Sequence, residues 1–227
     1  MKATFLGHAA VSLSDGETSI LIDPFLTGNP QAKISADEVE ANYIVLTHGH
    51  GDHVGDTVAI AERTGATCIA TYELALWLQS KGCDVHPMGI GGAHDFPFGS
   101  VRYTVAHHSG GVGELGDRYV GNPGGVIIDF GGKLVHHAGD TALTYDMKLI
   151  AERFAIDLAF LPIGSNFTMD IDDAVKATGF IRPRKVVPVH YNTWPPIEAD
   201  PQDFAAKVSE RTATEPVILA PMESVEI

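Results

Sequence analysis

The amino-acid sequence predicts a mixed α/β (α+β) fold in one domain that spans residues 1–227. Two observations lead to this prediction. The chain opens with short apolar runs separated by tight turns, which is typical of antiparallel strands. It continues, in both halves, with strands that alternate with helices, which favours parallel pairing in a covered sheet. Because 44% of the residues are hydrophobic, a sizeable core is available.

The N-terminal stretch predicts an antiparallel meander. Strands are expected at residues 2–6, 10–14 and 18–22, with a polar turn between the last two. The third strand ends at Asp23-Pro24, where the proline stops the hydrogen-bonded ladder. Residues 27–40 are polar, and we expect a surface loop or a short helix there.

The next part predicts a β-α-β-α-β segment. Its expected strands and helices are, in order, 43–47, 56–64, 66–70, 72–81 and 84–88. This alternation favours parallel pairing of the three strands. The glycine-rich stretch that follows, residues 89–99, is expected to form turns.

The second half predicts further strands and then alternating helices and strands. Strands are expected at 100–107, 125–130, 133–138, 157–161, 185–189 and 216–220, and helices at 144–154, 170–180 and 201–211. Asp170 is placed as the N-cap of the second of these helices. The long loop 109–125 either contacts a substrate or is a plain solvated connection. Its polar residues are Glu114, Asp117, Arg118, Tyr119 and Asn122.

Composition narrows the class of function. The balance of 15 basic and 29 acidic residues, or −14, disfavours binding to nucleic acid or to an anionic membrane. Bound divalent metals would add positive charge that this count omits. No apolar run approaches 18 residues, so no transmembrane helix is expected, and the N-terminus has no signal-peptide pattern, which predicts a cytoplasmic protein. Cys68 and Cys83 lack metal or redox spacing, and Cys68 is expected in the core.

One nonapeptide, Thr47-His48-Gly49-His50-Gly51-Asp52-His53-Val54-Gly55, concentrates three imidazoles and a carboxylate on a predicted strand-to-helix loop. Glycine lets the backbone turn tightly there. Imidazole and carboxylate together suit zinc, iron or manganese. The alternative is a histidine-rich loop without a metal, but this density of metal-binding side chains favours a metal site.

Three further residues, His108, Asp140 and His190, each follow an apolar run and precede a loop. If their strands share a sheet edge, all three can reach the nonapeptide. His107 and His108 are adjacent and point to opposite faces of a strand, so only one of them is expected to be a ligand.

The pattern His-x-His-x-Asp-His, together with Gly139-Asp140-Thr141, resembles the metallo-β-lactamase superfamily of metal-dependent hydrolases. The resemblance implies a four-layer αββα sandwich, with which the two halves of the chain are consistent. It also implies two metal ions. The residues implied for metal 1 are His48, His50, His108 and Asp140, and those for metal 2 are Asp52, His53, His190 and Asp140.

Three segments, Gly7-His8-Ala9, Pro162–Met169 and Val189–Pro195, resemble the UPF0173 metal-dependent hydrolases, a group similar to ascorbate-6-phosphate lactonases and N-acyl phosphatidylethanolamine phospholipases D. The resemblance covers nearly the whole chain, and the sequence His-Ser favours His108 over His107. One departure is Ser165-Asn166, where the family pattern has Gly-Asn or Gly-Asp.

Several residues are expected around the metals. Asp23 is either a turn-capping carboxylate or an acceptor that orients a metal-binding histidine, and the resemblance favours the second. His8 either packs in a turn or reaches the mouth of the site. His137 is placed behind the ligands, with its neighbour His136 packed or at the surface. Two asparagines are candidates for polar contact with a substrate oxygen, namely Asn166 and Asn192.

The implied activity is hydrolysis, by a hydroxide shared between two divalent metals, of an ester, a lactone or a phosphodiester. Asp52 and Asp140 are the expected catalytic residues, since each can accept a hydrogen bond from the hydroxide. The ligand set permits zinc, manganese, iron or nickel, with zinc and manganese preferred.

Three alternatives compete with this activity: a nuclease of the same superfamily, a di-iron redox protein, and a metal sensor without catalysis. The acidic charge and short chain disfavour the nuclease, and His50 in the second ligand position disfavours the di-iron protein. A small-molecule substrate is expected, without nucleic acid or membrane as a partner. The sequence is compatible with a homo-oligomer.

Overall fold

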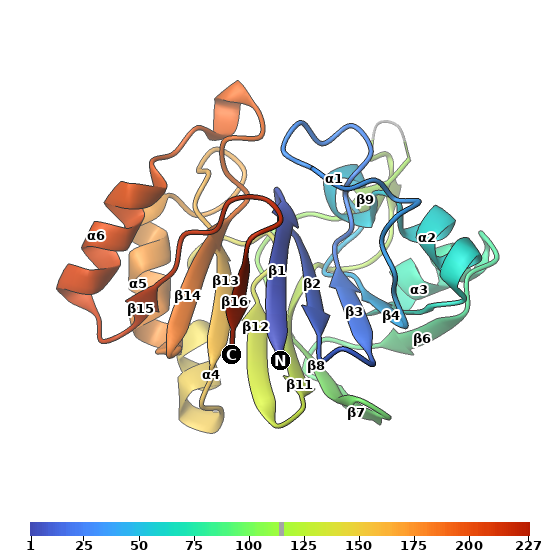
Figure 1. The fold of residues 1–227 in the computed structure, drawn as a ribbon, viewed down its shortest axis with the longest axis horizontal. Helices are drawn as coiled ribbons and strands as arrows, with labels where there is room; N and C mark the ends of the chain where they lie inside the picture. Colours follow the sequence, from blue (N-terminus) through green and yellow to red (C-terminus); the bar gives the residue numbers. More distant parts are fainter. Residues whose placement is uncertain (114–115) are drawn as a thin grey trace.

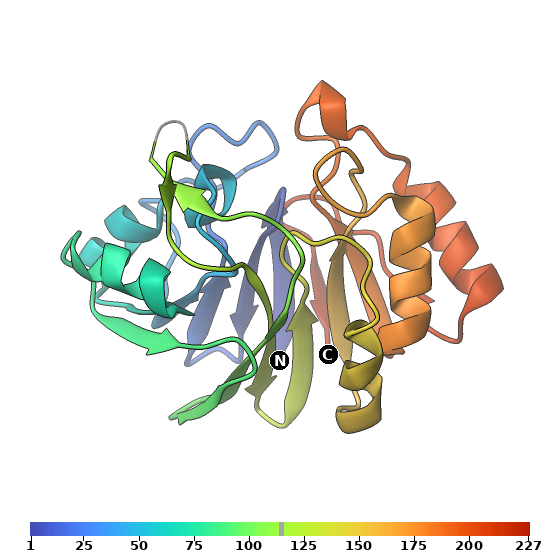
Figure 2. The ribbon, with the colours of Figure 1, turned by 180° about the vertical axis from the view of Figure 1, so that it is seen from behind.

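The computed structural model describes residues 1–113 and 116–227, and it shows two β-sheets packed face to face between helices (Figures 1 and 2). Glu114 lies outside the described residues. The first sheet contains, in spatial order, β16 (Ser224–Glu226), β1 (Lys2–Gly7), β2 (Ala10–Ser14), β3 (Ser19–Ile22), β4 (Tyr43–Val45), β5 (Thr67–Thr71) and β6 (Val85–Met88). Pairing is antiparallel from β16 to β3 and parallel from β3 to β6, which confirms both the predicted meander and the predicted parallel segment.

The second sheet has the same number of strands and a similar mixture of directions. Its order is β15 (Glu215–Pro216), β14 (Lys185–Val189), β13 (Leu158–Pro162), β12 (Lys133–His137), β11 (Gly124–Phe130), β8 (Gly99–Val105) and β7 (Ala93–Phe96). Strands β12 to β15 are parallel, whereas β11 pairs antiparallel with β12 and β8.

Helices cover the outer faces of both sheets. The first sheet carries α1 (Gly51–Val54), α2 (Thr57–Thr64) and α3 (Tyr72–Gln79), and the second carries α4 (Met147–Arg153), α5 (Ile171–Ile181) and α6 (Pro201–Arg211). The Asp170 side chain accepts a hydrogen bond from Asp173 N, which confirms it as the N-cap of α5. Two small elements complete the described chain, the ribbon of β9 (Gly111–Val112) with β10 (Arg118–Tyr119), and a 3₁₀ turn, η1 (Pro195–Ile197).

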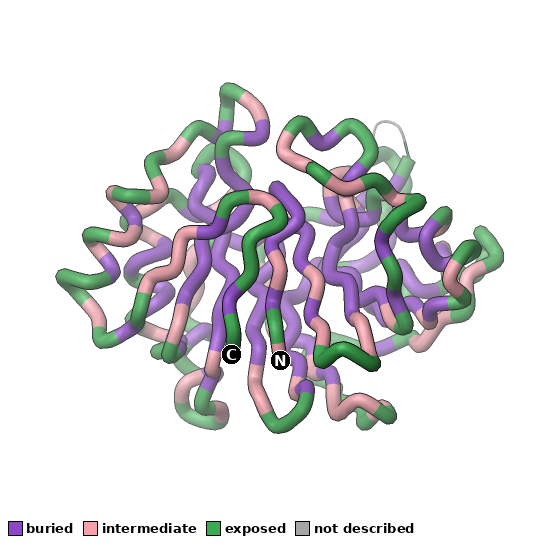
Figure 3. The backbone as a smooth tube through the Cα atoms, viewed as in Figure 1, coloured by how far each residue is buried: buried purple, intermediate pink, exposed green. Residues whose placement is uncertain are grey.

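Three separate apolar clusters lie at the three interfaces between these layers. Along β3, Ile20 and Ile22 face the second sheet, whereas Leu21 points to the helices. Strands of this kind are buried on both faces, so they are apolar throughout rather than alternating. Figure 3 shows the buried strands running through the centre of the molecule. The predicted four-layer αββα sandwich is therefore confirmed.

Two predictions about strands were wrong. Residues 89–99 were expected to form turns, but Ala93–Phe96 pair with β8 across a two-residue turn at Pro97-Phe98, and the packing of Phe96 on Phe98 supports this pairing. The last strand was expected at 216–220, but pairing there is confined to Glu215–Pro216. The chain then continues to β16, which pairs with β1. Both strands are short, and their pairing depends on distant partners that local composition does not reveal.

Loops that follow the strands gather at one edge of the sandwich, at the top of Figure 1, where α1, the segment after β3 and the turn of η1 come together. The described part of the chain has no helix that is both long and apolar enough to cross a membrane.

Candidate metal centre

The predicted metal loop lies where β4 runs out toward this edge. His48 and His50 follow the strand, and Asp52 and His53 belong to α1, a short helix that the sequence did not predict. His48 and His53 are buried, whereas Asp52 keeps 26% of its side chain exposed. Solvent therefore reaches the cluster from the side of Asp52 and the half-buried His50.

Three imidazoles form the first group of metal-binding side chains. His48 Nε2 lies 3.0 Å from His50 Nδ1, and His108 Nε2 lies 3.3 Å from the same atom. One nitrogen from each ring falls within 4.8 Å of the others, a spacing that could hold a metal ion. The structure thus brings together residues from loops 58 positions apart.

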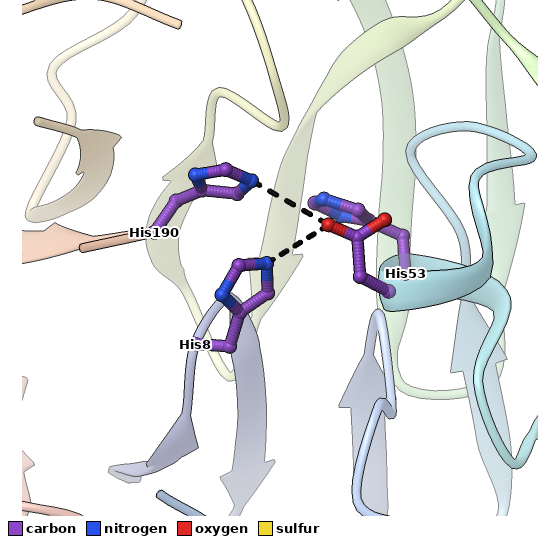
Figure 4. A group of neighbouring side chains, drawn as sticks. His8, His53 and His190 are labelled. Carbon is purple, nitrogen blue, oxygen red and sulfur yellow. Dashed lines mark hydrogen bonds and ion pairs between the residues drawn. The ribbon is translucent and has the colours of Figure 1, made fainter. Parts of the chain in front are cut away.

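A second group contains a carboxylate and three more imidazoles (Figure 4). Asp52 Oδ2 lies 3.7 Å from His190 Nε2 and 3.2 Å from His8 Nε2. His53 completes the group. Asp52, His53 and His190 were predicted as ligands of one metal. His8 was predicted either to pack in a turn or to reach the mouth of the site, and it lies directly beside these three residues.

Asp140 stands between the two groups. Its Oδ1 is 3.2 Å from His53 Nε2, and its Oδ2 is 3.1 Å from His190 Nε2 and 3.5 Å from His108 Nε2. The carboxylate is almost fully buried and contacts both sets of histidines. This is the position that a carboxylate shared by two metals would take.

The buried nitrogen and oxygen atoms of this cluster are better placed to bind a metal ion than to form hydrogen bonds with one another. His53 Nε2, His190 Nε2 and Asp140 Oδ1 are buried and lie at ion-pair distance from one another or from Asp140 Oδ2, but among the described residues none of the three makes a hydrogen bond of good geometry. Buried polar atoms are normally paired, so such orphans in a native fold need a partner of another kind. A divalent cation between these nitrogen and oxygen atoms satisfies them together.

Asp23 orients two of the histidines from behind. Its Oδ2 accepts from the Thr47 hydroxyl at 2.6 Å and from His53 Nδ1 at 2.7 Å, and its Oδ1 accepts from Thr47 N at 2.8 Å. The Thr47 hydroxyl in turn accepts from His48 Nδ1 at 3.0 Å. Both rings are therefore held with Nδ1 protonated and Nε2 facing the cluster, the arrangement expected of metal-binding histidines.

The electrostatics of the cluster depend on its carboxylates. Burial opposes charge on His190, but Asp140 and Asp52 outweigh it and raise the pKa of His190 to about 9. Burial also opposes the ionised form of Asp140, yet His53 and His190 hold its pKa well below the usual range. Without a cation, protons on these two histidines balance the buried carboxylates. A metal ion would take the place of those protons, so metal binding should release them.

The adjacent pair His136 and His137 lies on β12, whereas His107 and His108 do not lie on a strand as predicted, because β8 ends at Val105 and both residues belong to the loop that follows. His108 enters the cluster, whereas His107 is 60% exposed and lies 3.8 Å from Asp146. His137 Nε2 donates to Ala9 O at 2.9 Å, and its Nδ1 accepts from Gly139 N at 3.1 Å. His137 therefore supports the turn that presents Asp140, and His136 is packed inside the fold.

The two asparagines lie on loops at the same edge. Asn166 is exposed after β13, in the left-handed region with φ of 52°. Asn192 follows β14, and its Oδ1 accepts from Ala199 N at 2.8 Å, which shapes the loop around η1. Contact of either residue with a substrate stays a prediction.

The loop 109–125 approaches the metal loop directly. The buried Val112 and Val120 pack over Gly49, where a Cβ atom would collide with Val120. Ser109 Oγ lies 3.4 Å from His50 Nε2. Sequence reasoning placed the loop near the site but gave no role to this serine.

Three further residues were missed. Thr47 links Asp23 to His48, Gln31 bridges the turn at His8 and the loop after β14, and Thr193 contacts the His8 ring. Thr47 precedes the first histidine of the motif, which is a usable signal. Nothing near Gln31 in the sequence indicates its partners.

Comparison with known proteins shows the family and the fold of this chain. Residues 18–191 match the family model described as beta-lactamase superfamily domain. A UPF0173 metal-dependent hydrolase of Heliobacterium modesticaldum is 52% identical over 100% of this chain and 98% of its own, and one of Natranaerobius thermophilus is 48% identical over 100% of both. Among solved structures, Igni18, a metallo hydrolase from Ignicoccus hospitalis, aligns with a TM-score of 0.91 and 39% identity over 99% of this chain and 97% of that one.

Proposed function

The chain belongs to the UPF0173 metal-dependent hydrolases of the metallo-β-lactamase superfamily, and from this premise we propose that its histidine and aspartate cluster holds two divalent metal ions and hydrolyses a small-molecule ester, lactone or phosphodiester. The observation that carries the proposal is the buried Asp140 carboxylate, which faces both groups of histidines. His48, His50 and His108 would hold one metal, and Asp52, His53 and His190 the other. Asp140 would be shared.

Charge balance supports two metals rather than one. Three carboxylates converge here, and the pKa of each of Asp23, Asp52 and Asp140 is held below its usual range, so together they carry about −3. One divalent ion would leave a net negative charge buried among neutral imidazoles, whereas two leave about +1. A small positive excess attracts the negative charge that develops on a substrate during hydrolysis.

Bound divalent ions would lower the pKa of water toward 7 and polarise a carbonyl or phosphoryl oxygen. The residues of this chain supply orientation. Asp140 is almost fully buried and fixed by three histidines, so it holds its position throughout. Asp52 is partly exposed at the open side, so its carboxylate can accept a hydrogen bond from a water or hydroxide there and orient it toward a substrate.

The donor set limits the metal. Among the described residues, the cluster contains nitrogen and oxygen donors but no thiolate, because Cys68 lies in the core beneath the helices of the first sheet. Such a set suits zinc or manganese and also accepts iron or nickel. The net charge of −14 disfavours nucleic acid as the substrate.

Elemental analysis tests the proposal, with Asp140→Ala and His48→Ala beside the unchanged protein. We expect about two metal equivalents per chain in the unchanged protein, fewer in each variant, and loss of nearly all hydrolysis of an ester, lactone and phosphodiester panel. His136→Gln, a buried histidine outside the cluster, should keep both metals and serves as the control.

Full activity and full metal content in Asp140→Ala would contradict the proposal. Two bound metals without turnover on the whole panel would favour a metal sensor instead.

A further inference from the structure

His8 is the one member of the second group that stands outside the metal-loop motif and the strand-end ligands. It is fully buried in the turn between β1 and β2, with a left-handed φ of 56°. Residues other than glycine rarely adopt this conformation, and it persists where surrounding contacts impose it, often at functional sites. The contacts of His8 therefore indicate why the chain keeps this unfavourable backbone conformation.

Every polar atom of His8 has a partner. The backbone N donates to Gln31 Oε1 at 2.7 Å, and the backbone O accepts from His190 N at 2.7 Å. On the ring, Nδ1 lies 2.7 Å from Thr193 Oγ1, and Nε2 lies 3.2 Å from Asp52 Oδ2. The residue thus joins two proposed ligands of one metal. Its ring contacts the Asp52 carboxylate (Figure 4), and its backbone O accepts from His190 N.

The direction of these hydrogen bonds follows from the groups involved. A carboxylate can only accept, so the proton of a neutral His8 ring must be on Nε2, pointing at Asp52. The Nδ1 atom is then an acceptor, and the Thr193 hydroxyl must donate to it. Asp52 therefore selects the tautomer of His8, and the Thr193 hydroxyl, which can donate or accept, satisfies the other ring nitrogen and fixes the ring in place.

The His8 ring has little freedom to move. Its centroid lies 4.1 Å from that of His190, 5.0 Å from that of Trp194 and 5.7 Å from that of Phe25. Asp52, in contrast, is 26% exposed and sits on a four-residue helix. A partly exposed carboxylate gains affinity for a metal when a rigid partner restrains it.

We propose that His8 is a positioning residue, which holds the Asp52 carboxylate in place for the second metal through the hydrogen-bonded chain from Thr193 to His8 to Asp52. The inference rests on the proposed two-metal function and adds to it a residue that touches no substrate. Removing the contact with Asp52 should weaken the second metal selectively, since partners behind metal ligands typically contribute about 10- to 100-fold in affinity.

Two matched substitutions separate the hydrogen bond from the backbone strain. In His8→Gln the amide nitrogen can reach the place of Nε2 and donate to Asp52, whereas in His8→Asn the shorter side chain reaches only the place of Nδ1. Asparagine tolerates a positive φ better than glutamine does. If the hydrogen bond to Asp52 decides affinity for the second metal, His8→Gln should bind it more tightly than His8→Asn. If the backbone conformation decides it, the order should be reversed.

The measurement is titration of the chelator-treated full chain with Zn²⁺ and with Mn²⁺ by calorimetry, together with the visible spectrum of the Co²⁺-loaded protein. We expect two equivalents in every His8 variant at saturation. The second should bind about 10- to 100-fold more weakly in His8→Asn and close to normally in His8→Gln. Thr193→Val should fall between them, and His136→Gln should match the unchanged protein.

Distinct results overturn the inference. A drop to one equivalent in both His8 variants, with a changed Co²⁺ spectrum, would make His8 a direct ligand. Unchanged affinities with a lower melting temperature would make its role purely structural. Failure of the unchanged protein to bind two equivalents would instead refute the proposed function itself.

Discussion

At the scale of single residues, His136 shows how a buried histidine can serve the fold rather than the metal. It lies next to His137 on β12, is almost fully buried, and donates from Nδ1 to Val126 O at 3.0 Å. Burial lowers its pKa to about 4. The folded protein therefore holds this ring neutral at a pH where the unfolded chain would protonate it.

This makes the stability of the fold depend on pH in a defined direction. The folded pKa lies below the unfolded value of 6.5, so the contribution is complete above pH 6.5 and is lost as the pH falls toward 4. By linkage, His136 alone should lower the free energy of unfolding by about 2 kcal/mol between pH 7 and pH 5. Urea denaturation of the chelator-treated protein and of His136→Gln measures this.

Between pH 7 and pH 5, the free energy of unfolding of His136→Gln should fall by about 2 kcal/mol less than that of the unchanged protein, because the remaining histidines titrate equally in both proteins. Identical losses in the two proteins would show that His136 is protonated within the fold or is not buried as the structure has it.

Site residues whose type and spacing are typical of metal ligands could be predicted from the sequence. The metal loop, Asp140 and His190 are recognisable by residue type, spacing and order, and the structure brings them together. Gln31 and Thr193 carry no such signal, because glutamine and threonine are common and their partners are distant. Thr193 acts on a ring 185 positions away.

At the scale of elements, close packing between the β9–β10 ribbon and the metal loop yields a prediction. A Cβ on Gly49 would collide with the buried Val120 side chain, which is β-branched and stiff. Gly49→Ala should therefore cost about 1–3 kcal/mol through overpacking and should weaken metal binding at His48 and His50.

A second substitution tests this cause. Val120→Ala removes the colliding methyl groups, so the double variant should be more stable than the sum of the two single effects predicts, by at least about 0.5 kcal/mol. Urea denaturation of the four proteins gives the comparison. Strict additivity would show that Gly49 matters for its backbone rather than for the space above it.

Elements with strong local patterns were predicted closely. The helix α6 has the predicted bounds, and β1 to β3 differ from prediction by a residue at their ends. The elements that the sequence did not predict are β7 and β16 on the sheets, the β9–β10 ribbon, the four-residue α1 and the 3₁₀ turn η1. Each is too short for a periodic pattern, so tertiary contacts decide its conformation.

At the scale of the whole molecule, the proposed metals connect the two halves of the sandwich. His48, His50, Asp52 and His53 come from the first sheet, whereas the remaining ligands follow strands of the second. The three apolar clusters hold the layers together independently of the site. Metal removal should therefore loosen one edge of the molecule without unfolding it.

Chelation should lower the melting temperature while leaving the far-ultraviolet circular dichroism at 25 °C unchanged. A metal at 1,000 times its dissociation constant contributes about 4 kcal/mol, which corresponds to a shift on the order of 10 °C for a chain of this length. Asp140→Ala should show a smaller shift on chelation than the unchanged protein, because it holds less metal. Loss of the dichroism signal on chelation would show that the fold itself requires the metals.

The division of the site between the two halves also affects how the protein matures in the cell. The ribosome releases the metal loop first, and at that stage the nascent chain offers only part of the proposed ligand set. His190 emerges much later, after β13 and α5, and it completes the second group. On the proposed two-metal function, loading with both ions would follow synthesis of almost the whole chain, and a cell short of metal would accumulate folded, inactive protein that later supply would activate.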